Sequence, residues 1–156
     1  MKNSPPILLA RAVKYFLQGR IHFGKNVVGE INKEDDDYEV FRKVVLDAPK
    51  GKNVDPEAYF RVTFKFRNLS ASTNKKLSLI PIPFIVAQDG FRSKTWMIGR
   101  KTGRFQGFYE WDTVENAKQY WHSFPMKMMK KRSDLSSLNH EVYSLINKSD
   151  QPNKSL

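Results

Sequence analysis

Residues 59–67 alternate strictly between apolar and polar side chains, and this pattern restricts the fold more than any other stretch of the chain. A period of two residues is typical of a β-strand that buries one face and exposes the other. The apolar face carries Phe60, Val62, Phe64 and Phe66, and the polar face carries Arg61, Thr63, Lys65 and Arg67. The chain must therefore build a sheet with at least one aromatic-rich face.

The segment after this strand is helical but interrupted. Residues 75–86 are mostly apolar and contain Pro81 and Pro83. A residue that precedes proline avoids the α conformation, so Ile80 and Ile82 should be extended or lie at a kink. We expect a helical turn or two on either side of a bent joint.

Two strands, a broken helix and a last strand complete the pattern. The strands are predicted at 91–98, 104–111 and 138–146, and the first two are joined by the glycine-flanked hairpin loop 99–103. Asp112 and Glu115 resemble a capping box at the helix start, and Pro125 should restart the helix with Ser123 as a new cap. The order strand, helix, strand, strand, helix, strand predicts an α+β fold, the ferredoxin-like split βαβ with an antiparallel sheet.

The first part of the chain lies outside this pattern. It predicts an amphipathic helix over 7–18, an acidic turn over 34–37 and an extra strand over 38–46. We therefore divide the chain into an N-terminal arm (1–58), a ferredoxin-like domain (59–147) and a disordered tail (148–156).

Apolar side chains occur on both faces of the predicted strands. In the strand 104–111, one face carries Phe105, Tyr109 and Trp111, and the other carries Phe108 between two polar residues. Helices on one side of a four-stranded sheet leave the other side open, and a second copy of the chain would cover it most economically. We expect a homodimer.

Composition excludes several classes of protein. The chain has no Cys, which excludes disulfides, cysteine zinc sites and a thiol nucleophile. Its formal net charge is +11, but it has no zinc-finger, basic-zipper or KH pattern, so we expect no specific nucleic-acid partner. No apolar run approaches the roughly 20 residues that cross a bilayer. We expect a cytoplasmic protein.

The arm helix has three interpretations that the sequence leaves open. It can pack on its own domain, exchange onto a partner subunit, or lie on an anionic membrane surface as a peripheral anchor. The last is favoured by bases next to its apolar residues, namely Lys2, Arg11, Lys14, Arg20 and Lys25.

Residues 90–132 resemble the YdhR-like mono-oxygenase branch of the dimeric α/β-barrel superfamily, which includes proteins related to antibiotic-biosynthesis mono-oxygenases. The resemblance rests on Gly90-Phe91-Arg92-Ser93-Lys94 with Trp96, and on Gly107-Phe108-Tyr109-Glu110-Trp111-Asp112 with the helix that follows. With the flanking strands it covers about residues 59–146. It implies a ferredoxin-like barrel formed by two subunits, and it is weak for chemistry because the superfamily spans many activities.

The resemblance also argues against one activity. In haem-degrading members, a Trp and then the haem-ligating His follow the strand-end Trp at fixed spacings. The same spacings counted from Trp111 reach Tyr120 and Lys130. A lysine ammonium has no lone pair for iron, so haem degradation with a histidine ligand is disfavoured.

Aromatic residues of these strands and helices are the candidate site. A pocket for a planar apolar molecule could be lined by Phe64, Phe66, Trp96, Trp111 and Tyr120. Arg92, Lys94 or Arg104 could hold an anion, and Tyr109, Glu110 or His140 could move a proton. The competing interpretation is that they are core and dimer interface. The three His are scattered, with no HxH or HxxxH pair, and there is no P-loop and no dinucleotide motif, so we expect no metal and no cofactor.

Two functions follow from this pattern. The first is binding of a small apolar or aromatic ligand, with cofactor-independent mono-oxygenation as the activity that the resemblance implies. The second is a non-enzymatic binding or structural protein, in which the barrel serves only to dimerise. A cavity of several hundred Å³ inside the sheet would favour the first, and an interior filled by side chains would favour the second.

Overall fold

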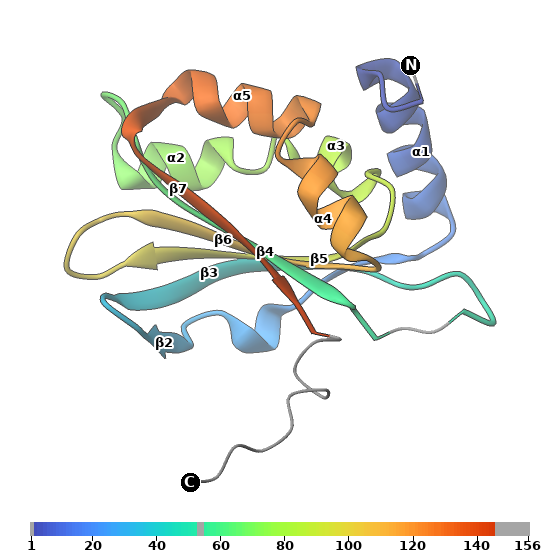
Figure 1. Cartoon of the computed structure of the whole chain (residues 1–156), viewed down its shortest axis with the longest axis horizontal. Coiled ribbons are helices and arrows are strands. Elements are labelled where there is room, and N and C mark those ends of the chain that lie inside the picture. The colour runs from blue at the N-terminus through green and yellow to red at the C-terminus, as the bar shows by residue number, and fades with distance from the viewer. Residues whose placement is uncertain (1, 53–54, 146–156) are drawn as a thin grey trace, which may run out of the picture.

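The computed structural model describes residues 2–52 and 55–145, which form one antiparallel sheet of seven strands. The α-helices lie on one face of this sheet (Figure 1). The predicted tail 148–156 and the end of the last predicted strand lie outside the described residues.

The ferredoxin-like unit is confirmed. Its strands lie in the order β7-β4-β6-β5, and each neighbouring pair is antiparallel. This is the arrangement that the split βαβ order requires. The elements are β4 (Ala58–Phe66), α2 (Ala71–Leu77), α3 (Ile82–Val86), β5 (Phe91–Gly99), β6 (Phe105–Trp111), α4 (Val114–Tyr120), α5 (Phe124–Arg132) and β7 (Ser133–Ser144).

The N-terminal segment extends the same sheet. The extra strand expected at 38–46 is present as β3 (Asp37–Leu46), which pairs with β5. The short strands β1 (Ile21–Phe23) and β2 (Ile31–Lys33), which pair with β3, and the 3-10 turn η1 (Lys25–Val27) were not predicted, because three residues are too few to show a period.

The first two helices after β4 flank a joint, as expected, but the first of them begins earlier. α2 begins at Ala71 rather than 75, because the Ser70 hydroxyl accepts a hydrogen bond from the Thr73 amide at 3.2 Å and caps the helix. Of the two expected alternatives for Ile82, the kink is the one observed, since Ile82 is not extended but begins α3 directly after the joint. Pro83 is tolerated there because the first helical turn needs no N–H partner.

The second pair of helices is broken where the sequence predicts. Ser123 caps α5 by accepting from the Met126 amide, which confirms the restart before Pro125. The predicted cap of the preceding helix is wrong. Thr113 accepts from Asn116 and caps α4, whereas Asp112 forms an ion pair with Arg92. β7 also begins at 133 rather than 138, in a polar stretch without alternation.

The face of the sheet opposite the helices carries its own small apolar cluster. Tyr38, Val40 and Met97 are buried there, and Val27 and Phe108 pack against them. The chain's own N-terminal segment therefore covers part of the face that we expected a second copy to cover.

A buried aspartate joins two turns at one end of the sheet. The Asp36 carboxylate accepts hydrogen bonds from the Thr102 hydroxyl at 2.5 Å and from the amides of Lys101 and Thr102. These bonds, led by the Thr102 hydroxyl, lower the pKa of Asp36 to about 2. A Cβ at Gly99 would lie 2.0 Å from this carboxylate, so the close approach requires glycine.

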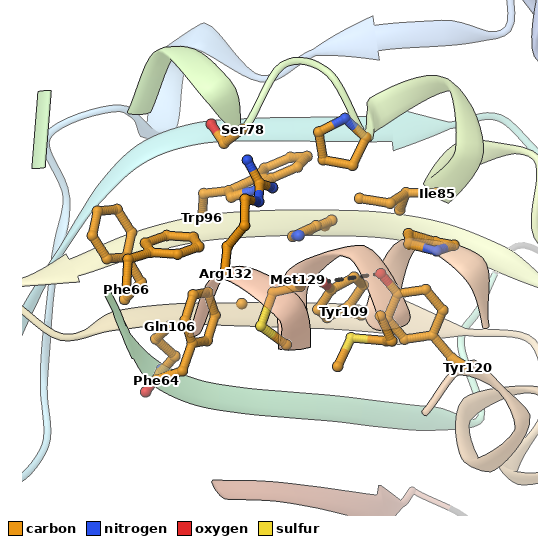
Figure 2. A pocket seen from close by; sticks show the side chains of 16 residues that line it. Phe64, Phe66, Ser78, Ile85, Trp96, Gln106, Tyr109, Tyr120, Met129 and Arg132 are labelled. Carbon is orange, nitrogen blue, oxygen red and sulfur yellow. Dashed lines mark hydrogen bonds between the residues drawn. The ribbon is translucent and has the colours of Figure 1, made fainter. Parts of the chain in front are cut away.

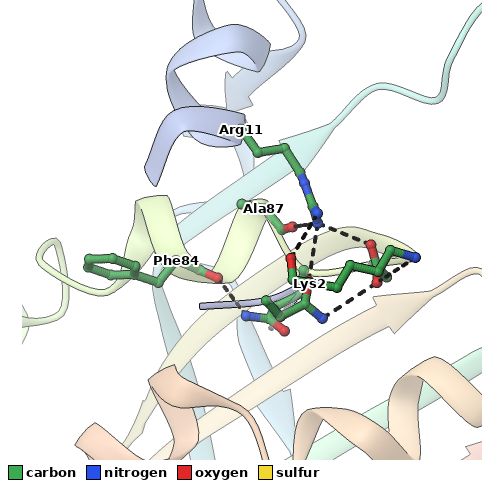
Figure 3. Close-up of polar contacts among 7 residues, drawn as sticks. Lys2, Arg11, Phe84 and Ala87 are labelled. Carbon is green, nitrogen blue, oxygen red and sulfur yellow. Dashed lines mark hydrogen bonds and ion pairs between the residues drawn. The ribbon is translucent and has the colours of Figure 1, made fainter. Parts of the chain in front are cut away.

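The arm helix α1 (Pro5–Leu17) packs on its own domain. Leu8 and Ala12 are buried on the side that faces α3. The Arg11 guanidinium donates to the carbonyl of Ala87 at 2.6 Å and to the carboxylate of Asp89 at 3.0 Å, and Lys2 also pairs with Asp89 (Figure 3).

The outer side of α1 remains exposed. Phe16 is 72% exposed and Leu17 is 79% exposed. Contact of this side with a membrane or a partner stays a prediction. None of the described helices is long and apolar enough to span a bilayer.

Candidate functional site

A small apolar cavity lies between the sheet and the helices (Figure 2). Its volume is about 40 Å³, which is room for about three water molecules. Ligand pockets of about 300–1,000 Å³ are usual for drug-sized molecules, so side chains fill most of this interior. The predicted site residues that line it are Phe64, Phe66, Lys94, Trp96, Tyr109 and Tyr120.

The alternation of the strands places these side chains together. In the pairing of β5 with β6, Lys94 lies opposite Tyr109 and Trp96 lies opposite Gly107, all on the helix-covered face. A Cβ at Gly107 would lie 2.8 Å from the Tyr109 ring, so glycine allows the ring to lie across the strand. The cavity thus depends on a missing side chain as well as on those present.

The amine of Lys94 is the most unusual group in the cavity. Its nitrogen lies 4.3 Å from the centre of the Trp96 ring and 4.5 Å from that of Tyr109, and the residue is only 7% exposed. Burial lowers the pKa of Lys94 well below its usual value, and the positive charges of Arg42 and Arg132 lower it further. More of the amine is therefore uncharged at neutral pH, and an uncharged amine can act as a base or a nucleophile.

Two tyrosine hydroxyls meet at the other side of the cavity. Tyr120 donates a hydrogen bond to the Tyr109 oxygen at 3.1 Å (Figure 2). Burial raises the pKa of both phenols, so both stay protonated. Tyr109 is therefore a poor proton acceptor. Because it accepts the bond from Tyr120, its own hydroxyl can still donate a hydrogen bond to an oxygen atom of a ligand in the cavity.

The charged groups around the cavity are all cations. No carboxylate is among the described residues that line it. The Arg132 guanidinium lies 5.7 Å from the Phe66 ring centre, and Arg42 donates to the Lys75 carbonyl and the Ser78 hydroxyl. An anionic group in this cavity would meet cations with no competing negative charge.

A larger cleft lies next to the cavity. It has a volume of about 350 Å³ and is lined by the start of α1, the loop before β5, and α4 and α5. Tyr120 lines both spaces and therefore stands between them. The break between α4 and α5 directly follows Tyr120.

The remaining predicted residues lie elsewhere. Glu110 is on the opposite face of the sheet, where it pairs with Tyr59. Trp111 lines the outer cleft, and Arg92 pairs with Asp112. His140 stacks on Trp121 with ring centres 3.6 Å apart, outside the cavity, and burial lowers its pKa.

Sequence reasoning missed the residues that α5 and the loop after α2 add to the cavity. They include Ser78, Met126, Met129 and Arg132. The helical spacing of the methionines was a signal for a buried side, but it did not indicate which strands that side would face. Among the described residues, no group of three or more His, Asp or Glu side chains could hold a metal ion.

No family model and no curated protein matches the chain. Several solved structures, however, match the fold of the chain. LmHde, a heme-degrading enzyme from Listeria monocytogenes, is 13% identical with a TM-score of 0.51, over 72% of this chain and 73% of that one. An uncharacterised ferredoxin-fold protein of the same species, related to antibiotic biosynthesis monooxygenases, is 12% identical with a TM-score of 0.52, over 74% and 68%.

A third structure agrees with these two. It is a monooxygenase-like protein from Listeria innocua, 16% identical with a TM-score of 0.50, over 79% of this chain and 68% of that one. At these identities the likeness shows a shared fold. The chain shares the ferredoxin-like fold with these proteins, as the resemblance of residues 90–132 implied.

Proposed function

We propose that this chain, which folds like monooxygenase-related proteins, binds a small electron-rich aromatic molecule beside Lys94 and oxygenates it without a cofactor. The observation that carries the proposal is the buried amine of Lys94, which lies among aromatic rings in a cavity without carboxylates. Such an amine can remove a phenolic proton and then hold the resulting anion as an ammonium.

The proposed reaction needs only the substrate and oxygen. A phenol transfers its proton to Lys94, and the phenolate oxygen accepts a hydrogen bond from the Tyr109 hydroxyl. The phenolate then reduces O₂ and is oxygenated at a ring carbon. One oxygen atom ends in the quinone as a new C=O bond, and the other leaves as water with the hydrogens of the broken C–H and O–H bonds. The substrate supplies all the electrons.

By size alone, the filled interior favours the non-enzymatic alternative, so the proposed binding requires the cavity to enlarge. Met126 and Met129 line it, and methionine side chains are unbranched and repack easily. Tyr120 stands between the cavity and the outer cleft, next to the break between α4 and α5. We propose that a ligand enters from the cleft when Tyr120 moves.

Oxygen uptake tests this function. With a dihydroxynaphthalene whose hydroxyls are in meta relation, the protein should consume one O₂ for each quinone formed. Lys94→Met should lower the rate by about 10²–10⁴-fold, the usual contribution of a general base. Lys118→Met, at an exposed position of α4, is the matched control and should leave the rate unchanged. Uptake that is absent, or equal in Lys94→Met and the parent, would contradict the proposal.

We also propose that two copies associate through the sheet face opposite the helices. Tyr59 and Phe108 lie on that face with ring centres 4.8 Å apart, and both remain partly exposed beside the segment that covers the rest. Light scattering at micromolar concentration should report a dimer for the parent and a folded monomer for Tyr59→Glu. A folded monomer for the parent would contradict this arrangement.

A further inference from the structure

We infer that Lys94 is a covalent capture site for short 2-oxo acids, with whose carbonyl carbon its amine forms an imine. This inference uses the same cavity as the proposed oxygenation, but it does not require the aromatic substrate. It rests on three features of the cavity: its size, the state of its amine and the sign of its charges.

The size of the cavity favours the smallest carbonyl compounds. Its volume of about 40 Å³ has room for about three waters, whose share of liquid volume is about 90 Å³. Pyruvate has six non-hydrogen atoms, about twice the content of three waters, so it needs less enlargement of the cavity than an aromatic ligand does. An aromatic aldehyde is larger and would require the helices to move.

The amine has the surroundings of a carbonyl-binding lysine. A desolvated lysine close to other cations stays uncharged more often, and the uncharged form attacks carbonyl carbon. Here Arg42 on β3 and Arg132 on α5 are the neighbouring cations, and burial lowers the pKa of Lys94. The rings of Trp96 and Tyr109, which lie against the nitrogen, would also stabilise the positive charge of a protonated imine.

The charge of the cavity favours an anionic carbonyl compound. Arg132 lines it, and no described lining residue carries a carboxylate. A ligand carboxylate would supply the missing negative charge, and the planar guanidinium can bind it through two parallel hydrogen bonds. A neutral ketone of similar size lacks this attraction.

The step balances without an oxidant or reductant. The Lys94 nitrogen forms a bond to the carbonyl carbon, and the carbonyl oxygen takes up the two amine hydrogens and leaves as water. The C=O bond is thus replaced by a C=N bond. The Tyr109 hydroxyl, whose hydrogen is not used by Tyr120, can donate to the oxygen as it leaves.

Trapping with sodium cyanoborohydride tests the inference, because it reduces the imine to a stable amine. The full chain is incubated with pyruvate and the reductant, and modified lysines are identified by mass spectrometry of peptides. We expect modification of Lys94 at least about tenfold faster than that of exposed Lys118. Equal rates at the two positions would overturn the inference.

Variants and a second probe separate the role of the Lys94 amine from that of the Arg132 guanidinium. Lys94→Arg keeps a cation but has no nucleophilic amine, so it should lose the fast modification while urea unfolding shows that it folds. Arg132→Met should slow trapping of pyruvate at least about tenfold more than it slows trapping of acetone, because the loss of its charge affects the amine for both probes but only pyruvate loses a carboxylate partner. If acetone reacts as fast as pyruvate in the parent, the carboxylate preference is wrong.

The outcome is independent of the oxygenase assay. Fast trapping of pyruvate without oxygen uptake would support the inference and contradict the proposed function. Oxygen uptake without trapping of pyruvate at Lys94 would support the proposed function and contradict the inference. Benzaldehyde gives a further comparison, since trapping as fast as that of pyruvate would show that the cavity does not select by size.

Discussion

The free energy of unfolding should rise as the pH is raised towards 10, and Lys94→Met should reduce this rise. The pKa of Lys94 is well below its usual 10.5 in the folded chain, so between the two values the unfolded chain binds more protons. Stability then increases with pH by up to about 1.4 kcal/mol per pH unit for one proton. The penalty of burying the charge is greatest below the folded pKa and disappears above the unfolded one.

Urea unfolding at a series of pH values measures this slope. The groups that face the amine are Arg42 on β3, Arg132 on α5, and the phenols of Tyr109 and Tyr120. Burial raises the pKa of both phenols, so their effect opposes that of Lys94 only above about pH 10, the usual tyrosine value. Lys118→Met should keep the parent's slope, and an unchanged slope in Lys94→Met would show that the amine is not buried in solution.

Phe60→Ala should destabilise the chain by about 3–5 kcal/mol, the usual cost of removing a buried aromatic ring. Phe60 is fully buried, and its ring packs against those of Tyr109 and Tyr120 at 5.4 and 5.3 Å between centres. It also contacts Trp121 and His140. The ring therefore holds α4 and the edge strand β7 against the centre of the sheet.

Chemical denaturation measures this loss, and an exposed phenylalanine provides the control. Phe16 is 72% exposed on α1, so Phe16→Ala should change stability by no more than about 0.5 kcal/mol. Similar losses for the two variants would mean that Phe60 is not part of a packed core. Because Phe60 touches both hydroxyl-bearing rings of the cavity, its loss should also lower the rate of imine trapping at Lys94.

Local sequence patterns were sufficient for the longer strands, the α-helices and most of the fold, but not for the three-residue strands β1 and β2. The alternation of 59–67 appears as β4, and the order of elements after it appears as the sheet order β7-β4-β6-β5. The alternation of side chains along a strand also predicted correctly that Tyr109 and Glu110 lie on opposite faces of the sheet. This alternation was therefore enough to exclude Glu110 from the candidate site.

Details that depend on competition between neighbouring residues were less predictable. Asp112 and Thr113 are both good helix caps, and the sequence favoured Asp112 through Glu115. In the structure Arg92, from a strand distant in sequence, pairs with Asp112, and Thr113 becomes the cap. The early start of β7 has a similar origin, because its polar first residues are ordered by pairing with β4, whereas α2 begins early through its own local cap at Ser70.

The sequence by itself determined which residues share a face and in what order the strands and helices follow, because periods of two and of 3.6 residues and the positions of Gly and Pro are local properties. Only the tertiary structure decided that Lys94 is buried between two rings, that Arg132 reaches the same space, and that His140 stacks on Trp121 instead. Desolvation and distance between segments far apart in the chain are set by packing, and they decide which of several similar residues can do chemistry.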